Sequence, residues 1–332
     1  MKFATLKDGS RDGHLVIVSA DLLRAVSARP LAKTLQDALE RWGKIEKQLH
    51  ARSDALNSGQ LDGSFQFSAK ACAAPLPRAY HWCDGSAFLN HGRLMEQAFG
   101  TPPIPDFETV PLIYQGGSDD FLGPLDDVPF RSEADGIDFE GEYGVVTDDV
   151  PMGIAAAEAS RHVRLVVQLN DWSLRVHAQR ELKTGFGFYL AKPSTSFAPI
   201  AVTPDELGDS WREGRVHLPL HIEWNNSHFG SPNGSEMQFS FFDLIAHAAA
   251  TRRLGVGTIV GSGTVSNQSR AAGSACISER RVIELLDQGS IKTSFMKFGD
   301  TIRMRAGSPE KSLFGAIEQQ VVPLSNRPPV DC

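Results

Sequence analysis

Gly136-Ile137-Asp138-Phe139-Glu140-Gly141-Glu142-Tyr143-Gly144-Val145-Val146 carries two carboxylates on alternate positions, Glu140 and Glu142. In an extended strand alternate side chains point to the same side, so the two glutamates share one face and Phe139 packs on the other. Two carboxylates this close repel each other, and either a proton or a hard divalent cation between them relieves the repulsion. An edge strand with a solvated acidic face explains the same pattern.

Two further acids favour the cation over the solvated edge. Asp171 lies in Leu169-Asn170-Asp171-Trp172-Ser173, and Asp84 lies in Trp82-Cys83-Asp84-Gly85-Ser86. If the fold brings these distant positions beside the Glu140 and Glu142 pair, the carboxylates become a candidate cation site. The competing interpretation of Asp171 is an N-cap for a helix over residues 172–182.

The composition is that of a folded globular protein. Of the 332 residues, 41% are hydrophobic and 22% are charged, and no apolar run approaches the ~20 residues that a membrane helix needs. The net charge is −7, and Lys and Arg do not cluster with interleaved aromatic residues, so neither nucleic acid nor a membrane is an expected partner. The first nine residues lack the apolar core of a signal peptide, which makes a cytoplasmic location the default expectation.

The cysteines argue against a zinc site. Cys72, Cys83, Cys276 and Cys332 are widely spaced and include no Cys-x-x-Cys pair. We expect each of them to be a free thiol in a reducing compartment.

Two prolines in Ala74-Pro75-Leu76-Pro77-Arg78 interrupt both regular structures and predict a domain boundary. We expect a small N-terminal α+β domain over residues 1–77 and a larger domain over residues 78–332.

The first domain is predicted to contain a strand at 13–18, a helix ending at 26, another helix from 31, and a long helix over 34–51. Predicted strands of the second domain cover 143–147, 163–169, 200–202, 218–224, 237–241, 282–286 and 301–304, and its main helices cover 85–99 and 242–250. Because these strands lack regular βα alternation, the pattern favours a strand-rich α+β fold built as a mixed β roll or sandwich.

Five motifs in order resemble the fumarylacetoacetate hydrolase family over about residues 78 to 325. They are Asp84...His91, Glu140-x-Glu142, Asn170-Asp171-Trp172-Ser173-Leu174-Arg175, Ala191-Lys192-Pro193-Ser194-Thr195-Ser196 and Gly261-Ser262-Gly263-Thr264-Val265-Ser266. The resemblance implies a mixed β-sandwich roll behind a small N-terminal domain, and commonly a homodimer.

The same resemblance implies a metal centre. Asp84, Glu140, Glu142 and Asp171 match the family's ligands of Mg²⁺ or Ca²⁺, with Mn²⁺ as a further candidate. The four side chains supply hard oxygen donors, which suit these ions.

The resemblance also assigns catalytic roles. His91 matches the general base and Glu279 its acidic partner, with Glu284 as a nearby rival for that partnership. A histidine in a helix is otherwise an ordinary surface or packing residue. Lys192 and Arg175 match cations that hold a developing oxyanion; the alternative for Lys192 is a solvated residue at a strand end.

Three hydroxyl side chains match substrate-binding positions. Thr264 and Ser196 would donate hydrogen bonds to a substrate carboxylate, and Tyr114 would contact the substrate. The chain departs from the animal enzyme at two places: an oxyanion-hole glutamine falls near Ala178, with Gln179 one position away, and Ser86 replaces a tyrosine.

These matches imply a hydrolase of carbon–carbon bonds in β-diketo acids. The first expectation is conversion of fumarylacetoacetate to fumarate and acetoacetate in the breakdown of tyrosine and related aromatic compounds. Hydrolysis of an acylpyruvate is an alternative, as is decarboxylation or hydration by a lyase on the same scaffold. A calcium-binding protein without catalytic activity belongs to a different class, and the His91 and Glu279 pair speaks against it.

Overall fold

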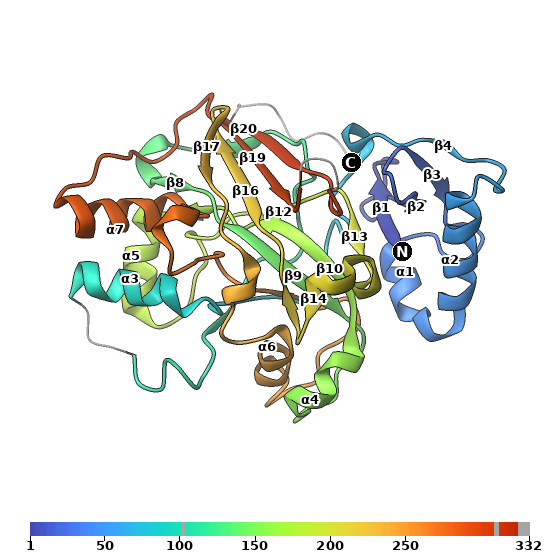
Figure 1. The fold of residues 1–332 in the computed structure, drawn as a ribbon, viewed down its shortest axis with the longest axis horizontal. Helices are drawn as coiled ribbons and strands as arrows, with labels where there is room; N and C mark the ends of the chain where they lie inside the picture. Colours follow the sequence, from blue (N-terminus) through green and yellow to red (C-terminus); the bar gives the residue numbers. More distant parts are fainter. Residues whose placement is uncertain (101–103, 309–311, 325–332) are drawn as a thin grey trace.

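A computed structural model describes residues 1–100, 104–308 and 312–324 of the chain (Figure 1). Two β-sheets dominate it, which confirms the predicted strand-rich α+β class. None of the described helices is long and apolar enough to cross a membrane. Cys72, Cys83 and Cys276 are buried free thiols, and the expectation for Cys332 lies outside the described residues.

The larger sheet joins the N-terminal strands to the centre of the molecule. Its strands, in spatial order, are β4 (Phe65–Gln66), β3 (Arg24–Ser27), β2 (His14–Val18), β1 (Lys2–Leu6), β13 (Ala201–Val202), β10 (Val163–Asn170), β9 (Gly141–Thr147), β18 (Ile259–Gly261), β5 (Trp82–Gly85) and β6 (Ile113–Gln115), and β12 (Ser196–Phe197) pairs with β10. Most neighbours are antiparallel, but β18 and β5 are parallel, so the sheet is mixed. Because β1 pairs with β13, residues 1–77 share this sheet with the rest of the chain, and a division at residue 77 stays a prediction.

A second sheet of five strands packs on the first. Its order is β17 (Ser227–Gly230), β16 (Leu220–Trp224), β19 (Thr301–Ala306), β20 (Ile317–Pro323) and β7 (Val128–Phe130). Two small antiparallel sheets of two strands each join β8 (Ile137–Asp138) to β11 (Ser173–Leu174) and β14 (Trp211–Arg212) to β15 (Arg215–Val216). Gly141 allows the two large sheets to approach, because a Cβ there would lie 2.9 Å from side-chain atoms of Ile222 and Leu220.

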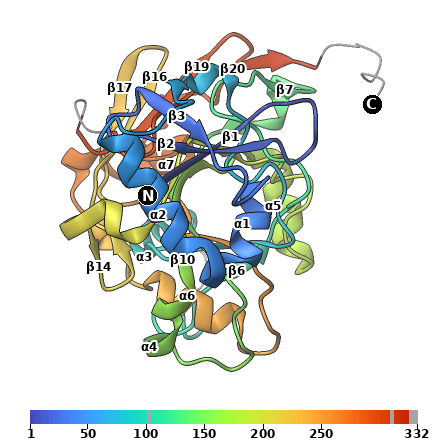
Figure 2. The same ribbon diagram turned by 90° about the vertical axis from the view of Figure 1, so that its right-hand side faces the viewer.

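The helices lie outside the sheets. They are α1 (Leu35–Glu40), α2 (Trp42–Asn57), α3 (Leu89–Phe99), α4 (Ala156–Ala159), α5 (Arg175–Thr184), α6 (Phe241–Ala248) and α7 (Ile277–Gln288). Figure 2 views the molecule from the side on which α1 and α2 lie, and α3, α5 and α7 lie at the opposite end in Figure 1.

The two faces of the larger sheet belong to different hydrophobic cores. Val145 of β9 packs in the core that includes Ile222 and Met304 of the second sheet. Val146 packs in the core that includes Leu35 and Leu49 of α1 and α2. Successive side chains of β9 therefore alternate between the cores, as the period of a strand requires.

Six predicted elements differ from the structure. The helix predicted from residue 31 is absent, and the helix predicted over 34–51 is two helices, α1 and α2, separated at Arg41. Residues 24–27 form β3 rather than the end of a helix, because Ala25 and Val26 both pack in the cores on either side of the sheet. Residues 282–286 belong to α7, where burial recurs at the helical spacings of three residues, from Glu279 to Val282, and seven residues, from Ile277 to Glu284. Residues 237–241 precede and enter α6, whose N-terminus is capped by Ser240. Residues 82–85 form β5, so α3 begins only at Leu89.

Candidate functional site

Three carboxylates converge at one end of the larger sheet. Asp84 lies in β5, Glu142 lies in β9 and Asp171 directly follows β10, which are near neighbours in the sheet. One carboxylate oxygen from each lies within 4.8 Å of the other two, and all three side chains are buried. We call Asp84, Glu142 and Asp171 the carboxylate triad. The structure thus brings three of the four predicted metal ligands together.

Glycines make room for the triad. Gly261 of β18 is in register with Asp84, and a Cβ at Gly261 would lie 2.3 Å from Asp84 Oδ1. Gly263 adopts a positive φ of 73° and donates its backbone N–H to the same oxygen at 3.1 Å. The Gly-rich turn after β18 therefore positions Asp84.

The triad holds more negative charge than its immediate surroundings neutralise. Burial, followed by the charge of Asp171, raises the pKa of Asp84 to about 8. Burial and the charges of Asp84 and Asp171 raise the pKa of Glu142 well above its ordinary value. Neither oxygen of Glu142 has a hydrogen-bond partner among the described residues. These buried oxygen donors fit a hard divalent cation such as Mg²⁺, Ca²⁺ or Mn²⁺.

Glu140 lies beside the triad but outside it. Its Oε1 is 2.7 Å from Arg175 Nη2 and 3.2 Å from Lys192 Nζ, and its Oε2 accepts a hydrogen bond of 2.6 Å from Thr264. Burial opposes ionisation, but Lys192 and Arg175 hold the pKa of Glu140 well below its ordinary value. Its assignment as a metal ligand stays a prediction.

The alternative interpretation of the Glu140-x-Glu142 pattern, a solvated edge strand, is wrong, because β9 lies between β10 and β18 in the sheet.

Lys192 connects Glu140 to the triad. Its Nζ lies 2.6 Å from Asp171 Oδ2, and its side chain is nearly buried, so the solvated alternative is wrong. Burial would lower its pKa, but Asp171 and Glu140 raise that pKa above the ordinary value. The ammonium therefore keeps its charge next to the triad.

Arg175, the first residue of α5, is held by two acids. Its Nε donates to Asp138 at 2.8 Å, in addition to its ion pair with Glu140. Asp138 also accepts hydrogen bonds from the backbone N–H groups of Ile277 and Ser278 at the start of α7. The sequence interpretation missed Asp138, although its place two residues before Glu140 was a usable signal.

His91 and Glu279 form a hydrogen-bonded pair between α3 and α7. His91 Nδ1 lies 2.9 Å from Glu279 Oε2, with the His91 side chain 19% exposed and the Glu279 side chain 1% exposed. The rival Glu284 instead accepts hydrogen bonds from the backbone N–H groups of Lys292 and Thr293 and from the Thr293 hydroxyl. The structure therefore pairs His91 with Glu279, while the catalytic role of the pair stays a prediction.

Each of the three predicted substrate-binding hydroxyls forms a hydrogen bond with another side chain of the protein. Tyr114 donates to Asp171, Thr264 donates to Glu140, and buried Ser196 accepts from the indole of Trp172 at 2.9 Å. Their roles toward a substrate stay predictions.

The surroundings of Asp171 differ from the sequence interpretation in two ways. Thr195 was missed, although it belongs to the 191–196 motif and donates to Asp171 Oδ1 at 2.8 Å. Asp171 is not a helix cap, because α5 begins at Arg175 with Leu174 as its N-cap residue.

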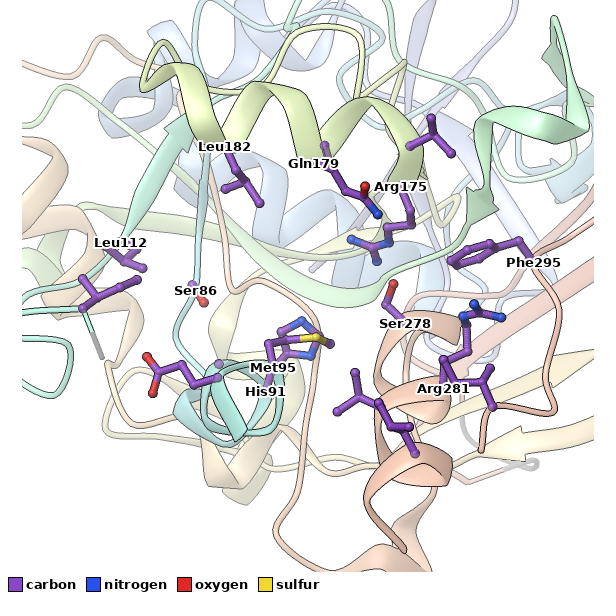
Figure 3. Close-up of a pocket in the computed structure, with 18 of the residues that line it drawn as sticks. Ser86, His91, Met95, Leu112, Arg175, Gln179, Leu182, Ser278, Arg281 and Phe295 are labelled. Atoms are coloured by element: carbon purple, nitrogen blue, oxygen red, sulfur yellow. The ribbon is translucent and has the colours of Figure 1, made fainter. Parts of the chain in front are cut away.

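A cavity of about 640 Å³ opens among α3, α5 and α7. Figure 3 shows His91 and Arg175 on opposite sides of it, with Gln179 beside Arg175 and Ser86 near the base of the helix that carries His91. Both positions at which the chain departs from the animal enzyme, Ser86 and the 178–179 pair, therefore line this cavity.

Two family models match the chain. The model of the fumarylacetoacetate (FAA) hydrolase C-terminal domain matches residues 80–322, and the model of fumarylacetoacetase N-terminal domain 2 matches residues 1–78. The chain belongs to the fumarylacetoacetate hydrolase family. The family resemblance inferred from the five motifs is thereby confirmed.

Individual relatives are distant. The chain is 28% identical over 165 residues to 2,4-didehydro-3-deoxy-L-rhamnonate hydrolase of Sphingomonas sp. (strain SKA58), covering 49% of this chain and 54% of that protein. It is 26% identical over 185 residues to the human mitochondrial oxaloacetate tautomerase FAHD2B, and the match covers 55% of this chain and 54% of that protein. It thus spans about half the length of these curated relatives.

A solved structure of maleylpyruvate hydrolase from Sphingobium sp. SYK-6, in complex with manganese(II) ion and pyruvate, has a TM-score of 0.63 to this chain. The match is 15% identical in sequence and covers 97% of this chain and 99% of that one, so it supports the shared fold.

Proposed function

We propose that this chain is a metal-dependent hydrolase that cleaves a carbon–carbon bond in a β-diketo acid. The observation that carries the proposal is the carboxylate triad, with an unpartnered Glu142, in a site that also contains a buried ammonium and a hydrogen-bonded His91 and Glu279 pair. Family membership and the hydrolase names of two relatives support the same reaction class.

Asp84, Glu142 and Asp171 would hold the cation, with Glu140 as a further candidate ligand. When bound, the cation supplies Lewis-acid polarisation to the carbonyl groups of the diketo acid. The choice among Mg²⁺, Ca²⁺ and Mn²⁺ stays open, and the manganese in the maleylpyruvate hydrolase complex supports a divalent ion of this kind.

His91 and Glu279 would activate the water. With Nδ1–H donating to Glu279, the Nε2 atom of His91 is left as a proton acceptor. His91 removes a proton from a water molecule while the oxygen of that water adds to the ketone carbon. Glu279 then stabilises the imidazolium that results. When the carbon–carbon bond breaks, its electron pair passes to the leaving enolate, and the imidazolium returns a proton to that enolate's carbon.

Lys192 and Arg175 would stabilise the negative charge that develops on the attacked carbonyl and then on the enolate. Their contacts to Asp171, Glu140 and Asp138 fix both cations before the substrate arrives. Preorganised charge of this kind costs no rearrangement during the reaction.

Two kinds of β-diketo acid fit this chemistry. Fumarylacetoacetate has a carboxylate at each end, whereas an acylpyruvate has one carboxylate and an acyl group that can be apolar. A second candidate reaction is keto–enol tautomerisation of an oxo acid, which the name of the human oxaloacetate tautomerase favours. Decarboxylation or hydration by a lyase on the same scaffold would also depend on stabilisation of an enolate, as hydrolysis and tautomerisation do.

The test is a spectrophotometric assay that follows loss of the enol absorbance of a panel of diketo acids, with and without EDTA. We expect metal-dependent cleavage, with both products identified, and loss of turnover but not of metal binding in His91→Ala. His162→Ala is a matched control, because His162 forms a comparable pair with Asp148 elsewhere on the molecule. Unchanged turnover in His91→Ala would remove the assigned base, and persistent tautomerisation without cleavage would favour the second candidate.

A further inference from the structure

We infer that Glu181 of α5 is a positioning residue that holds Lys192 in place beside Asp171 and Glu140. This inference deepens the proposed function and rests on it, because Lys192 is the proposed partner of the developing negative charge. Glu181 acts through the backbone of the residues that directly precede Lys192.

The carboxylate of Glu181 binds three successive backbone N–H groups. Its Oε2 accepts hydrogen bonds from Tyr189 at 3.0 Å and from Ala191 at 3.1 Å, and its Oε1 accepts one from Leu190 at 2.8 Å. We call these three hydrogen bonds the Glu181 clasp. Burial of the carboxylate opposes ionisation, but the three N–H groups hold the pKa of Glu181 below its ordinary value. The acceptor is therefore charged at neutral pH, which strengthens each hydrogen bond.

The segment that the clasp holds has little else to fix it. Residues 185–190 lie between α5 and β12 and belong to neither a helix nor a strand. Gly185 and Gly187 adopt positive φ angles of 72° and 92°, and glycine is the residue with the most backbone freedom to lose. The side chains of Phe186 and Tyr189 are 97% and 85% exposed, so their packing does not fix the backbone. The Glu181 clasp therefore supplies the order that packing does not.

Ala191 carries the constraint to Lys192. Its N–H belongs to the clasp, and its carbonyl oxygen accepts a hydrogen bond of 2.8 Å from the N–H of Leu174, the N-cap residue of α5. Both polar backbone groups of the residue before Lys192 are thus held by α5 or its N-cap. A defined starting point for the Lys192 side chain follows from this arrangement.

The same helix positions the second proposed cation. Arg175 is the first residue of α5, and Figure 3 shows it at the cavity. Because Glu181 lies farther along α5 and binds the backbone before Lys192, one helix fixes Arg175 and Lys192 relative to each other. Both cations contact Glu140 Oε1, at 2.7 Å and 3.2 Å, and these contacts require that they approach one point together.

Glu284 of α7 provides an internal comparison. It accepts hydrogen bonds from the backbone N–H groups of Lys292 and Thr293, in the segment that follows its own helix. That segment precedes none of the residues proposed to bind the metal, activate the water or stabilise the oxyanion. Glu284→Gln therefore removes a similar anchor without disturbing Lys192, and it is the matched control.

The first test measures amide hydrogen exchange by mass spectrometry on the full chain. In Glu181→Gln the amide keeps the size of the side chain, but its NH₂ group replaces one of the two acceptor oxygens. We expect amides 189–191 to exchange faster by about tenfold in Glu181→Gln and at the wild-type rate in Glu284→Gln. Unchanged exchange in Glu181→Gln would overturn the inference.

The second test measures the affinity of the Mn²⁺-loaded chain for oxalate, a dianion whose adjacent oxygens resemble those of an enolate of an oxo acid. Calorimetry compares the wild type, Glu181→Gln, Lys192→Met and the double variant. We expect Glu181→Gln to weaken binding by about tenfold when Lys192 is present and by less than about twofold in the Lys192→Met background. Glu181→Ala is a second variant with the same expected loss, and Glu284→Gln should bind oxalate as the wild type does.

This comparison distinguishes positioning from a purely structural role. Partial unfolding would lower the number of binding sites per chain but not the affinity of the folded fraction, and it would act equally in both backgrounds. An equal loss of affinity with and without Lys192, or no loss, would overturn the inference. Absence of oxalate binding in the wild type would overturn it as well, since an ammonium held beside the metal site should meet the anion.

Kinetics separate the inference from the proposed function. The substrates are acetylpyruvate and hexanoylpyruvate, acylpyruvates with a short and a longer apolar acyl group. If one is cleaved, kcat should fall by about tenfold in Glu181→Gln. If neither they nor any other diketo acid is cleaved but the oxalate result holds, the proposed reaction fails and the inference stands. If cleavage occurs but the loss of oxalate affinity does not depend on Lys192, the reaction stands and the inference is overturned.

Discussion

The carboxylate triad lies on or next to strands of the larger sheet and is fully buried, whereas the cavity wall beside it comes largely from α3, α5, α7 and the segments that join them. In the triad, backbone pairing fixes Asp84 against Gly261 and Glu142 against Leu169, and Gly261 leaves room for the Asp84 carboxylate. In the wall, side chains such as Leu182 and Ile291 are exposed. A site fixed by strands holds its geometry closely, while a helical wall tolerates substitution. We therefore expect changes in the triad region to abolish chemistry and changes in the wall to alter substrate choice.

Apart from the loss of turnover expected in His91→Ala, the largest effect is expected from Lys192→Met. This change removes the ammonium that contacts both Asp171 and Glu140 and that would stabilise the developing negative charge. Turnover should fall by about 10³-fold, the scale for losing a preorganised charge partner. Steady-state kinetics on the metal-loaded variant measures this, with Lys7→Met as a control at an exposed ion pair. A fall of less than tenfold would contradict the role of Lys192.

Glu279→Gln should have the next largest effect. The amide keeps the shape of the side chain but cannot stabilise the imidazolium of His91. We expect kcat to fall by about 10²-fold and metal affinity to stay unchanged. Glu284→Gln provides the matched control, since Glu284 hydrogen-bonds within the 292–293 segment instead. Equal losses in the two variants would indicate a structural rather than a catalytic role.

The metal-free protein should lose stability as pH rises. The pKa of Asp84 is about 8 in the folded chain against a reference value of 3.8, so between these values the folded state binds more protons than the unfolded state. The free energy of unfolding should therefore fall with rising pH in this window, by up to about 1.4 kcal/mol per pH unit for one proton. Urea unfolding in EDTA at several pH values measures the slope. Saturating Mg²⁺ or the Asp84→Asn change should flatten it, and an equal slope in all three cases would refute the assignment.

The smallest effect is expected from Ile291→Ala in the cavity wall. Ile291 is partly exposed, so the change should raise KM for hexanoylpyruvate by about threefold and leave kcat for acetylpyruvate unchanged. Kinetics on both substrates would show it. A comparable loss of turnover on both acids would contradict the division between chemistry and substrate choice.

The two regions also differ in how far the sequence predicts them. The Glu140-x-Glu142 motif and its neighbours could be recognised because the spacing within a strand fixes which side chains share a face. Asp138 and Thr195 were missed although each lies in or next to a recognised motif, because the motif does not tell which partner the fold places beside each of them, α7 for Asp138 and Asp171 for Thr195.

The cavity wall could not be predicted from the sequence. Its apolar residues come from segments that are distant in the chain and that form a wall only after folding. The strand predicted at 282–286 shows the same limit, because a short apolar run in α7 does not reveal its helical period.

The most direct test of the account is calorimetric titration of the chain with Mn²⁺, comparing the wild type with Glu142→Gln. Glu142 is the triad member whose oxygens lack hydrogen-bond partners among the described residues, so its carboxylate is the one most available to a cation. We predict one bound ion per chain in the wild type and an affinity lower by about 10²-fold in Glu142→Gln. Equal affinity in both proteins would show that the cation binds elsewhere and would contradict the account.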